Sequence, residues 1–179
     1  YKGSSREDFI ASAFYAYSTS LVIKAGKVLG EDVSYYTDLY DRIVAAFRQA
    51  YPVYETQTEC ILAAHFSLAP DPQAAADQLA EMVRSAGIHI KTGFVGTPYI
   101  LHVLSKYGHA DLAYSLLLRK EYPSWLYPVT KGATTIWEHW DGIMENGDFW
   151  SADMNRVSPG IFFLLPFGGD SSMPPASLP

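Results

Sequence analysis

The feature that most constrains this sequence is a repeated helix cycle: a start signal, apolar residues at steps of three and four, and then a glycine or proline stop. Residues 71–87 show one complete cycle. Asp71 and Pro72 supply an N-cap and a first-turn proline, apolar positions follow from Leu79 to Ala86, and Gly87 ends the run. The sequence therefore predicts a helix with a defined start and a defined end.

The same cycle recurs along the chain, with almost no strand-like alternation. Ser4 with Glu7 and Thr56 with Glu59 both have capping-box spacing. The expected helices run from Ser4 to Gly30, Tyr36 to Pro52, Thr56 to Pro70, Asp71 to Gly87, Thr97 to Gly108, and onward from Gly108 with Leu112, Leu116 and Leu117 facing inward. Because short loops join these helices, sequence neighbours must pack antiparallel. We therefore expect an all-α fold built of helical hairpins.

Composition and charge exclude several classes of protein. With 13 Lys and Arg against 19 Asp and Glu the net charge is −6, and the chain has no basic stripe that would bind nucleic acid or an anionic membrane. The longest apolar runs, such as residues 161–166, are too short for a bilayer, which takes about 20 residues. Cys60 is the single cysteine, so neither a disulfide framework nor a cysteine zinc site is expected. The sequence thus predicts no nucleic-acid partner and no membrane span.

Few familiar catalytic motifs are present. The chain has no Gly-x-Ser-x-Gly elbow, no phosphate loop, no dinucleotide fingerprint and no His-Glu-x-x-His pair. Cys60, His65 and His102 fall on mainly apolar helical stretches, where core residues are the commoner case. Glu138 stands beside His139, but no further ligand follows at metal spacing. No metal and no cofactor are expected.

Three segments between or after the helices are rich in aromatic residues: 89–97, 122–125 and 132–141. All four tryptophans stand at position 125 or later. Loops gain little by exposing large rings, so these rings must lie against something. One interpretation is that they line a sugar-binding cleft, and the other is that they plug the open end of the helical assembly. Composition leaves both open.

The last of these segments concentrates carboxylates among indoles. Glu138 lies between Trp137 and Trp140, and Asp141 follows three residues after Glu138. Hydrolysis of a glycosidic bond needs one carboxyl to protonate the leaving oxygen and a second to activate water or attack carbon. The alternative is structural, because Thr135 and Glu138 have capping-box spacing and could begin a short helix. From the residues alone the cap is the commoner arrangement.

Three ordered motifs resemble a known family. They are Thr92-Gly-Phe-Val-Gly-Thr97, Tyr122-Pro-Ser-Trp125 and Gly132-Ala-Thr-Thr-Ile-Trp-Glu-His-Trp-Asp141. Together they resemble the C-terminal half of the catalytic domain of bacterial α-L-rhamnosidases of glycoside hydrolase family 78. The resemblance covers about residues 5–155, and the order of the three motifs makes it more specific than any one of them.

The resemblance implies a partial (α/α)6 barrel and an inverting hydrolysis that releases L-rhamnose from rhamnose-containing glycosides. In that family the Glu of the Ala-Thr-Thr-x-Trp-Glu motif is taken as the general base, and it falls on Glu138. This match raises the interpretation of Glu138 as a site residue above that of a helix cap. The substrate-binding side chains that the resemblance implies are His89, Phe94, Trp125, Trp137 and Trp140.

The chain departs from the family pattern in two places. The family's general acid belongs to an acidic motif upstream of this stretch, and no part of the chain matches it. The family also continues with an Asn-His-Tyr motif, whereas Asn155 is followed here by Arg156. We therefore expect a catalytic-domain fragment over residues 1–155 and an atypical tail, rich in proline and glycine, over residues 156–179.

These departures shape the expected activity. Alone, the chain should be a weak or inactive hydrolase, since about half of a closed barrel leaves inner helix faces unpaired. A missing N-terminal half before Tyr1 or a second copy in a homo-oligomer would cover those faces. The alternative from another class is a non-catalytic helical module for carbohydrate binding or interaction. A third is an α/α-barrel glycosidase for a different sugar.

Overall fold

The computed structural model describes residues 5–135, 137, 139–140, 142–144 and 146–148. Its helices are α1 (Glu7–Leu29), α2 (Ser34–Ala50), α3 (Gln57–His65), α4 (Pro72–Ser85), α5 (Thr97–Lys106), α6 (Ala110–Leu117) and α7 (Tyr127–Thr130). The described part of the chain contains no β-strand, which confirms the predicted all-α class. None of these helices combines the length and the apolar character that a bilayer span requires.

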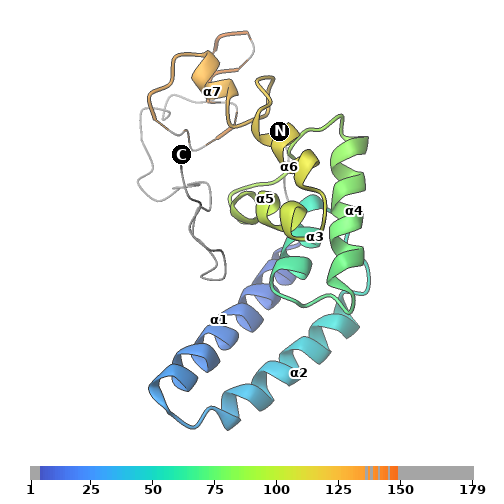
Figure 1. The fold of residues 1–179 in the computed structure, drawn as a ribbon, viewed down its shortest axis with the longest axis vertical. Coiled ribbons are helices and arrows are strands. Elements are labelled where there is room, and N and C mark those ends of the chain that lie inside the picture. Colours follow the sequence, from blue (N-terminus) through green and yellow to red (C-terminus); the bar gives the residue numbers. More distant parts are fainter. Residues whose placement is uncertain (1–4, 136, 138, 141, 145, 149–179) are drawn as a thin grey trace, which may run out of the picture.

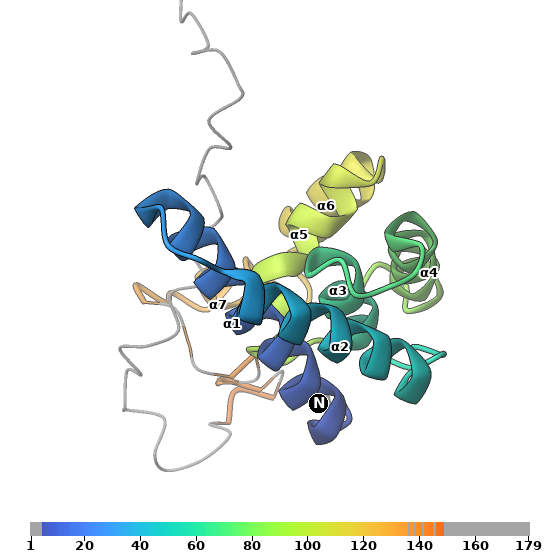
Figure 2. The same cartoon turned by 90° about the horizontal axis from the view of Figure 1, so that it is seen from below.

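Consecutive helices pair as three antiparallel hairpins, α1 with α2, α3 with α4 and α5 with α6 (Figure 1). The α1–α2 hairpin extends away from the other helices, at the end of the molecule opposite α7 (Figure 1). α3 also contacts α1 and α5, which places α1, α3 and α5 in one layer. Seen from below, α4 and α6 lie farther from α1 than α3 and α5 do (Figure 2). α4 and α6 therefore cover the outer side of that layer (Figure 2).

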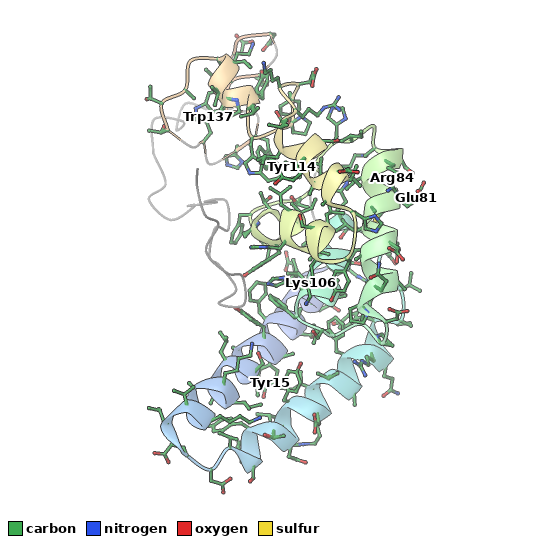
Figure 3. The ribbon with its side chains drawn as sticks, in the orientation of Figure 1. Tyr15, Glu81, Arg84, Lys106, Tyr114 and Trp137 are labelled. Carbon is green, nitrogen blue, oxygen red and sulfur yellow. The ribbon has the colours of Figure 1, made fainter. Side chains whose placement is uncertain are left out.

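Burial follows this layering. In α3, at the middle of the layer formed by α1, α3 and α5, every side chain from residue 57 to residue 64 is buried. α4 is amphipathic: Leu79 and Val83 are buried, whereas Glu81 and Arg84 are exposed and project outward from the helix (Figure 3). A helix packed on all sides reads as a continuous apolar run, and an outer helix shows one apolar stripe. Residues 60–64 of α3 match the first pattern, and α4 matches the second.

A partly buried ion pair joins the start of α1 to α3. The Glu59 side chain, on the first turn of α3, is only 1% exposed, and that of Arg6, before α1, is 35% exposed. Arg6 Nη2 lies 2.7 Å from Glu59 Oε2, and Arg6 Nε donates to Oε1 at 3.0 Å. The backbone N–H of Glu55 donates to Oε2 at 2.8 Å. The guanidinium also lies over the ring of Phe9, 5.5 Å from its centroid.

These contacts keep the Glu59 carboxyl ionised. Burial alone would raise its pKa, but the hydrogen bonds from the Arg6 side chain and from the Glu55 N–H outweigh burial and lower the pKa below its usual value. The carboxylate therefore stabilises the folded chain above the pKa that it has when unfolded. That stabilisation is lost as the pH falls through the folded-state pKa.

Most predicted helix limits are confirmed. α2 ends before Pro52, and α4 begins after Asp71, whose Oδ1 accepts from the Ala74 N–H at 3.1 Å. Gly87, with φ of +70°, follows the end of α4 as expected. At the start of α3, Thr56 Oγ1 accepts from the Glu59 N–H at 3.1 Å, so the predicted cap is present. The Glu59 carboxylate departs from the box pattern because it pairs with Arg6.

Two helix starts differ from the prediction. α1 begins at Glu7 after Arg6, which makes no side-chain cap, and Ser4 lies outside the described residues. The Ser4–Glu7 capping box is therefore wrong as the start of this helix. α5 begins at Thr97 itself, with Gly96 as the cap residue. Thr97 Oγ1 donates backward to the Gly93 carbonyl at 2.8 Å instead of capping the helix.

Two further helix features were missed or misplaced. α3 ends at His65 and not near Pro70, because Ser67 adopts φ of +59° and the N–H groups of Leu68 and Ala69 both turn back to the Ala63 carbonyl, at 2.9 and 3.0 Å. The single turn of α7 was not predicted. In α6, the predicted inward positions Leu112 and Leu116 are buried, while Leu117 is half-buried.

The residues predicted for the core divide into two groups. Cys60 is fully buried, and burial raises the pKa of its thiol to about 12. His65 and His102 are half-buried between α3 and α5, with ring centroids 6.1 Å apart. Burial first, and then the charges of His102, Lys106 and Lys24, lower the pKa of His65 to about 4. His65 therefore stays neutral in the fold above about pH 4.

Replacing Arg6 with Met should destabilise the chain by about 2–4 kcal/mol, because the buried Glu59 carboxylate loses its charged partner. Urea unfolding measures this change. The matched control is Arg42→Met, which breaks the exposed Arg42–Asp38 pair (2.9 Å) and should cost less than about 1 kcal/mol. Adding Glu59→Met to Arg6→Met should recover part of the loss. Equal effects of Arg6→Met and Arg42→Met would contradict the assigned role of the pair.

The free energy of unfolding should fall as the pH is lowered from 6.5 to about 4, partly through His65. In that window the unfolded chain binds a proton that the folded chain resists, so acid favours unfolding. His65→Phe keeps a ring beside Tyr99 but cannot titrate, and should flatten this pH dependence. Urea unfolding at a series of pH values measures the slope. A variant whose slope equals that of the wild-type chain would contradict the assignment.

Candidate functional site

The first turn of α3 holds the loop that carries the first aromatic motif. Gln57 is 4% exposed, and its amide makes two hydrogen bonds to the backbone of that loop. Nε2 donates to the His89 carbonyl at 3.1 Å, and Oε1 accepts from the Lys91 N–H at 2.8 Å. The two bonds fix the loop at positions two residues apart. The Gln57 amide thus supplies the hydrogen-bond partners that these two backbone groups of the loop require.

The next residue of α3 seats the other end of the loop. A Cβ added at Gly96 would lie 2.7 Å from Thr58 Oγ1 and 3.2 Å from Thr58 Cγ2. Gly96 has φ of −97°, so space, and not backbone conformation, requires glycine here. Thr92 Oγ1 lies 2.7 Å from Thr97 Oγ1 and closes the loop across its base. The loop is therefore held on both sides by its own hydroxyls and by α3.

Trp140 joins this loop to the segment that was predicted to be catalytic. Its Nε1–H donates to the Thr92 carbonyl at 3.1 Å, across 48 positions of sequence. Its ring meets that of Trp125 edge to face, with centroids 5.5 Å apart and planes at 85°. Edge-to-face packing is the geometry that the charge distribution of aromatic rings favours. All three motifs of the resemblance therefore meet at Trp140.

Trp137 lies beside α7 (Figure 3). Its ring is 6.4 Å from that of Tyr127, which is 4% exposed, and the planes are nearly perpendicular at 87°. Tyr127 also donates its hydroxyl to the Ile143 carbonyl at 2.9 Å. Its N–H donates to Ser124 Oγ at 3.1 Å. Tyr127 thus connects the second motif with the segment that follows the third.

The other predicted site residues have distinct environments. Phe94 is 68% exposed and stands out from the loop. His89 Nδ1 lies 2.9 Å from the Ala86 carbonyl, so this imidazole is held at the end of α4. Glu138 lies outside the described residues, as does Asp141. The structure thus brings Trp125 and Trp140 together, whereas Phe94 and His89 occupy separate positions on the loop.

The alternatives from the sequence can be compared with this geometry. Residues 137, 139 and 140 are not helical, and Glu138, on which the capping-box interpretation depends, lies outside the described residues. Trp125 and Trp140 are half-buried and pack against the core, as a plug would, while Phe94 is exposed, as a sugar-contacting ring would be. Within the described residues, no three or more His, Cys, Asp or Glu side chains are grouped so as to hold a metal ion.

Sequence reasoning missed two residues that organise the site. Tyr127 precedes Pro128, and a proline at the start of a helix would have indicated α7. Gln57 gave a weaker signal, a polar residue directly after a cap and before the apolar run of α3. Neither signal shows which partner the side chain binds, because those partners lie 16 and 32 or more positions away.

Comparison with known proteins gives a consistent result. Residues 1–157 match the family model described as bacterial alpha-L-rhamnosidase 6 hairpin glycosidase domain. The chain is 42% identical over 160 residues to an alpha-L-rhamnosidase of Streptomyces avermitilis, covering 85% of this chain and 16% of that protein. A relative in Formosa agariphila is 38% identical over 168 residues, covering 88% and 18%. The chain thus spans less than a fifth of the length of these relatives.

Solved structures agree with the sequence matches. The crystal structure of the Streptomyces avermitilis alpha-L-rhamnosidase complexed with L-rhamnose superposes with a TM-score of 0.81 at 41% identity, covering 84% of this chain and 16% of that chain. The Aspergillus terreus enzyme superposes with a TM-score of 0.77 at 32% identity, covering 83% and 18%. Together with the three hairpins, these matches identify an (α/α)6-type fold.

Gly96→Ala should destabilise the chain by about 1–3 kcal/mol, because the new methyl group overlaps Thr58 and displaces the loop. Urea unfolding measures the loss. Adding Thr58→Ala removes Oγ1 and Cγ2, two of the three Thr58 atoms that crowd this methyl group, and should restore part of the stability. A Gly96→Ala chain as stable as wild type would contradict the close seating of the loop on α3.

Proposed function

The chain belongs to the bacterial alpha-L-rhamnosidase six-hairpin glycosidase domain family, and we propose that it supplies the general base and an aromatic wall of a site that hydrolyses terminal α-L-rhamnosides. The observation that carries the proposal is the hydrogen bond from Trp140 to the Thr92 carbonyl. It fastens Trp140, two positions after Glu138 in the sequence, to the aromatic loop. The relatives' names supply the sugar, since they are alpha-L-rhamnosidases.

In the proposed reaction Glu138 acts as the base. Its carboxylate accepts a proton from a water molecule while the water oxygen attacks the anomeric carbon of rhamnose. The bond from that carbon to the aglycone oxygen breaks, and a carboxylic acid protonates the departing oxygen. The anomeric configuration is inverted, because water attacks the face opposite the leaving group. No residue of this chain matches the family's general acid, so a group outside this chain must supply that proton.

The aromatic residues would shape the sugar site. The only hydrogen-bond donor of the Trp140 side chain binds the Thr92 carbonyl, which fixes the orientation of the ring. The ring can therefore offer only an apolar surface to a ligand. L-Rhamnose carries a methyl group and several C–H bonds that suit such a surface. Trp125 supports Trp140 from the side, and Trp137 precedes the base. Phe94 and His89 would contact the substrate from the loop.

The missing acid predicts which substrates the chain can cleave. When the aglycone is a strongly acidic phenol, the phenolate departs without being protonated. An alkoxide is a poor leaving group, so cleavage of an alkyl rhamnoside requires protonation of the departing oxygen. We expect slow rhamnose release from 2,4-dinitrophenyl α-L-rhamnoside and none from methyl α-L-rhamnoside. Glu138→Gln should lower the slow rate by about 10²–10⁴-fold. Glu121→Gln is the control, because that carboxylate is exposed and pairs with Arg119 at 3.4 Å.

Two outcomes would contradict this account. Robust cleavage of the methyl glycoside by the chain alone would show that it contains a general acid. Equal rates for wild type and Glu138→Gln would remove Glu138 from the reaction. Saturable binding of L-rhamnose without any hydrolysis would instead favour the non-catalytic carbohydrate-binding module, to which the exposed ring of Phe94 is suited.

A further inference from the structure

Gln57 is a buried polar side chain near the site, and the proposed reaction does not use it. Its side chain is buried, and both ends of its amide bind main-chain groups of one loop, the His89 carbonyl and the Lys91 N–H. Since a buried amide that loses its partners costs the full desolvation penalty, this pairing resists displacement. Gln57 therefore sets where residues 89–91 run.

Residue 91 is connected to Trp140 through the next residue, Thr92. Lys91 and Thr92 are adjacent, so fixing the N–H of one restricts the carbonyl of the other. That Thr92 carbonyl is the acceptor for Trp140 Nε1, at 3.1 Å. One short stretch of backbone is thus bound by α3 on one side and by Trp140 on the other.

Trp140 has a second constraint that makes it sensitive to this loop. Its half-buried ring packs edge to face on Trp125, with 5.5 Å between ring centroids. The hydrogen bond to Thr92 and the packing on Trp125 therefore restrain the Trp140 ring from two sides. A loop that shifts at residue 92 must either break the hydrogen bond or move the ring off Trp125. The first would release the indole N–H, and the second would move Trp140, two positions after the proposed base in the sequence.

We propose that Gln57 is a positioning residue, which acts through the 89–92 backbone to hold Trp140, two positions after the proposed base Glu138 in the sequence. Gln57 itself does not touch the substrate. The role in catalysis rests on the proposed function, but the structural coupling of Gln57 to Trp140 does not. It is a long-range role, since Gln57 stands 81 positions before Glu138 in the sequence.

The test reads the Trp140 hydrogen bond directly. A chain labelled with ¹⁵N-tryptophan gives four indole N–H signals, one for each tryptophan, and Trp140→Phe identifies the signal of Trp140. Gln57→Met has nearly the same volume but neither hydrogen bond. We expect it to speed exchange of the Trp140 indole proton with water by about tenfold or more. Circular dichroism checks that the helices remain.

The matched control is Gln78→Met on α4. Gln78 Nε2 also donates to a backbone carbonyl, that of Tyr54, at 2.8 Å, so this variant loses a bond to residue 54 and not to the 89–97 loop. Its effect on Trp140 exchange should stay within about twofold. Should Gln57→Met fail to fold, Gln57→Glu replaces it: the carboxylate keeps the acceptor for Lys91 and loses the donor to His89, so exchange should still accelerate.

The outcomes separate the two proposals. Unchanged Trp140 exchange in a folded Gln57 variant, or equal acceleration in Gln78→Met, would overturn the positioning role. Faster exchange together with slower release of rhamnose from the dinitrophenyl glycoside would support both. If exchange is faster in the Gln57 variant but even the wild-type chain releases no rhamnose, the coupling is supported and only the proposed function is contradicted.

Discussion

The buried carboxylate of Glu59, paired with Arg6, is the interaction on which the rest of the structure depends. It fixes the start of α1 against the start of α3, and in α3 every side chain from residue 57 to residue 64 is buried. Three consecutive residues of its first turn have separate tasks. Gln57 binds the loop, Thr58 seats Gly96, and Glu59 accepts the guanidinium. The same turn therefore serves both the fold and the site.

Hairpin topology explains why the motifs meet although they are far apart in sequence. In antiparallel hairpins, the starts of α1, α3 and α5 share one end with the ends of α4 and α6 (Figure 1). The 89–97 loop joins α4 to α5, and the tryptophan-rich segment follows α6, so both emerge at that end. The opposite end carries only short connections, such as residues 30–33. Geometry thus gathers the aromatic residues at the one end where α3 can hold them.

Local signals predicted much of this fold, and long-range contacts account for what they missed. Glycine and proline marked the ends of α2 and α4 because backbone conformation is a local property. The early end of α3 depends on Ser67 in a left-handed conformation, which no local preference indicated. The family resemblance placed the motifs together. It could not name Gln57 or Tyr127, because their roles arise from partners brought close only by folding.

The central claim is that these loops form a rhamnose site around Glu138, and titration of the ¹⁵N-tryptophan-labelled chain with L-rhamnose tests it most directly. The account predicts that the indole signals of Trp137 and Trp140 shift with a saturable dependence on L-rhamnose, and that D-glucose does not shift them. If the signals of Trp137 and Trp140 stay fixed up to the highest L-rhamnose concentration that can be reached, the account is contradicted.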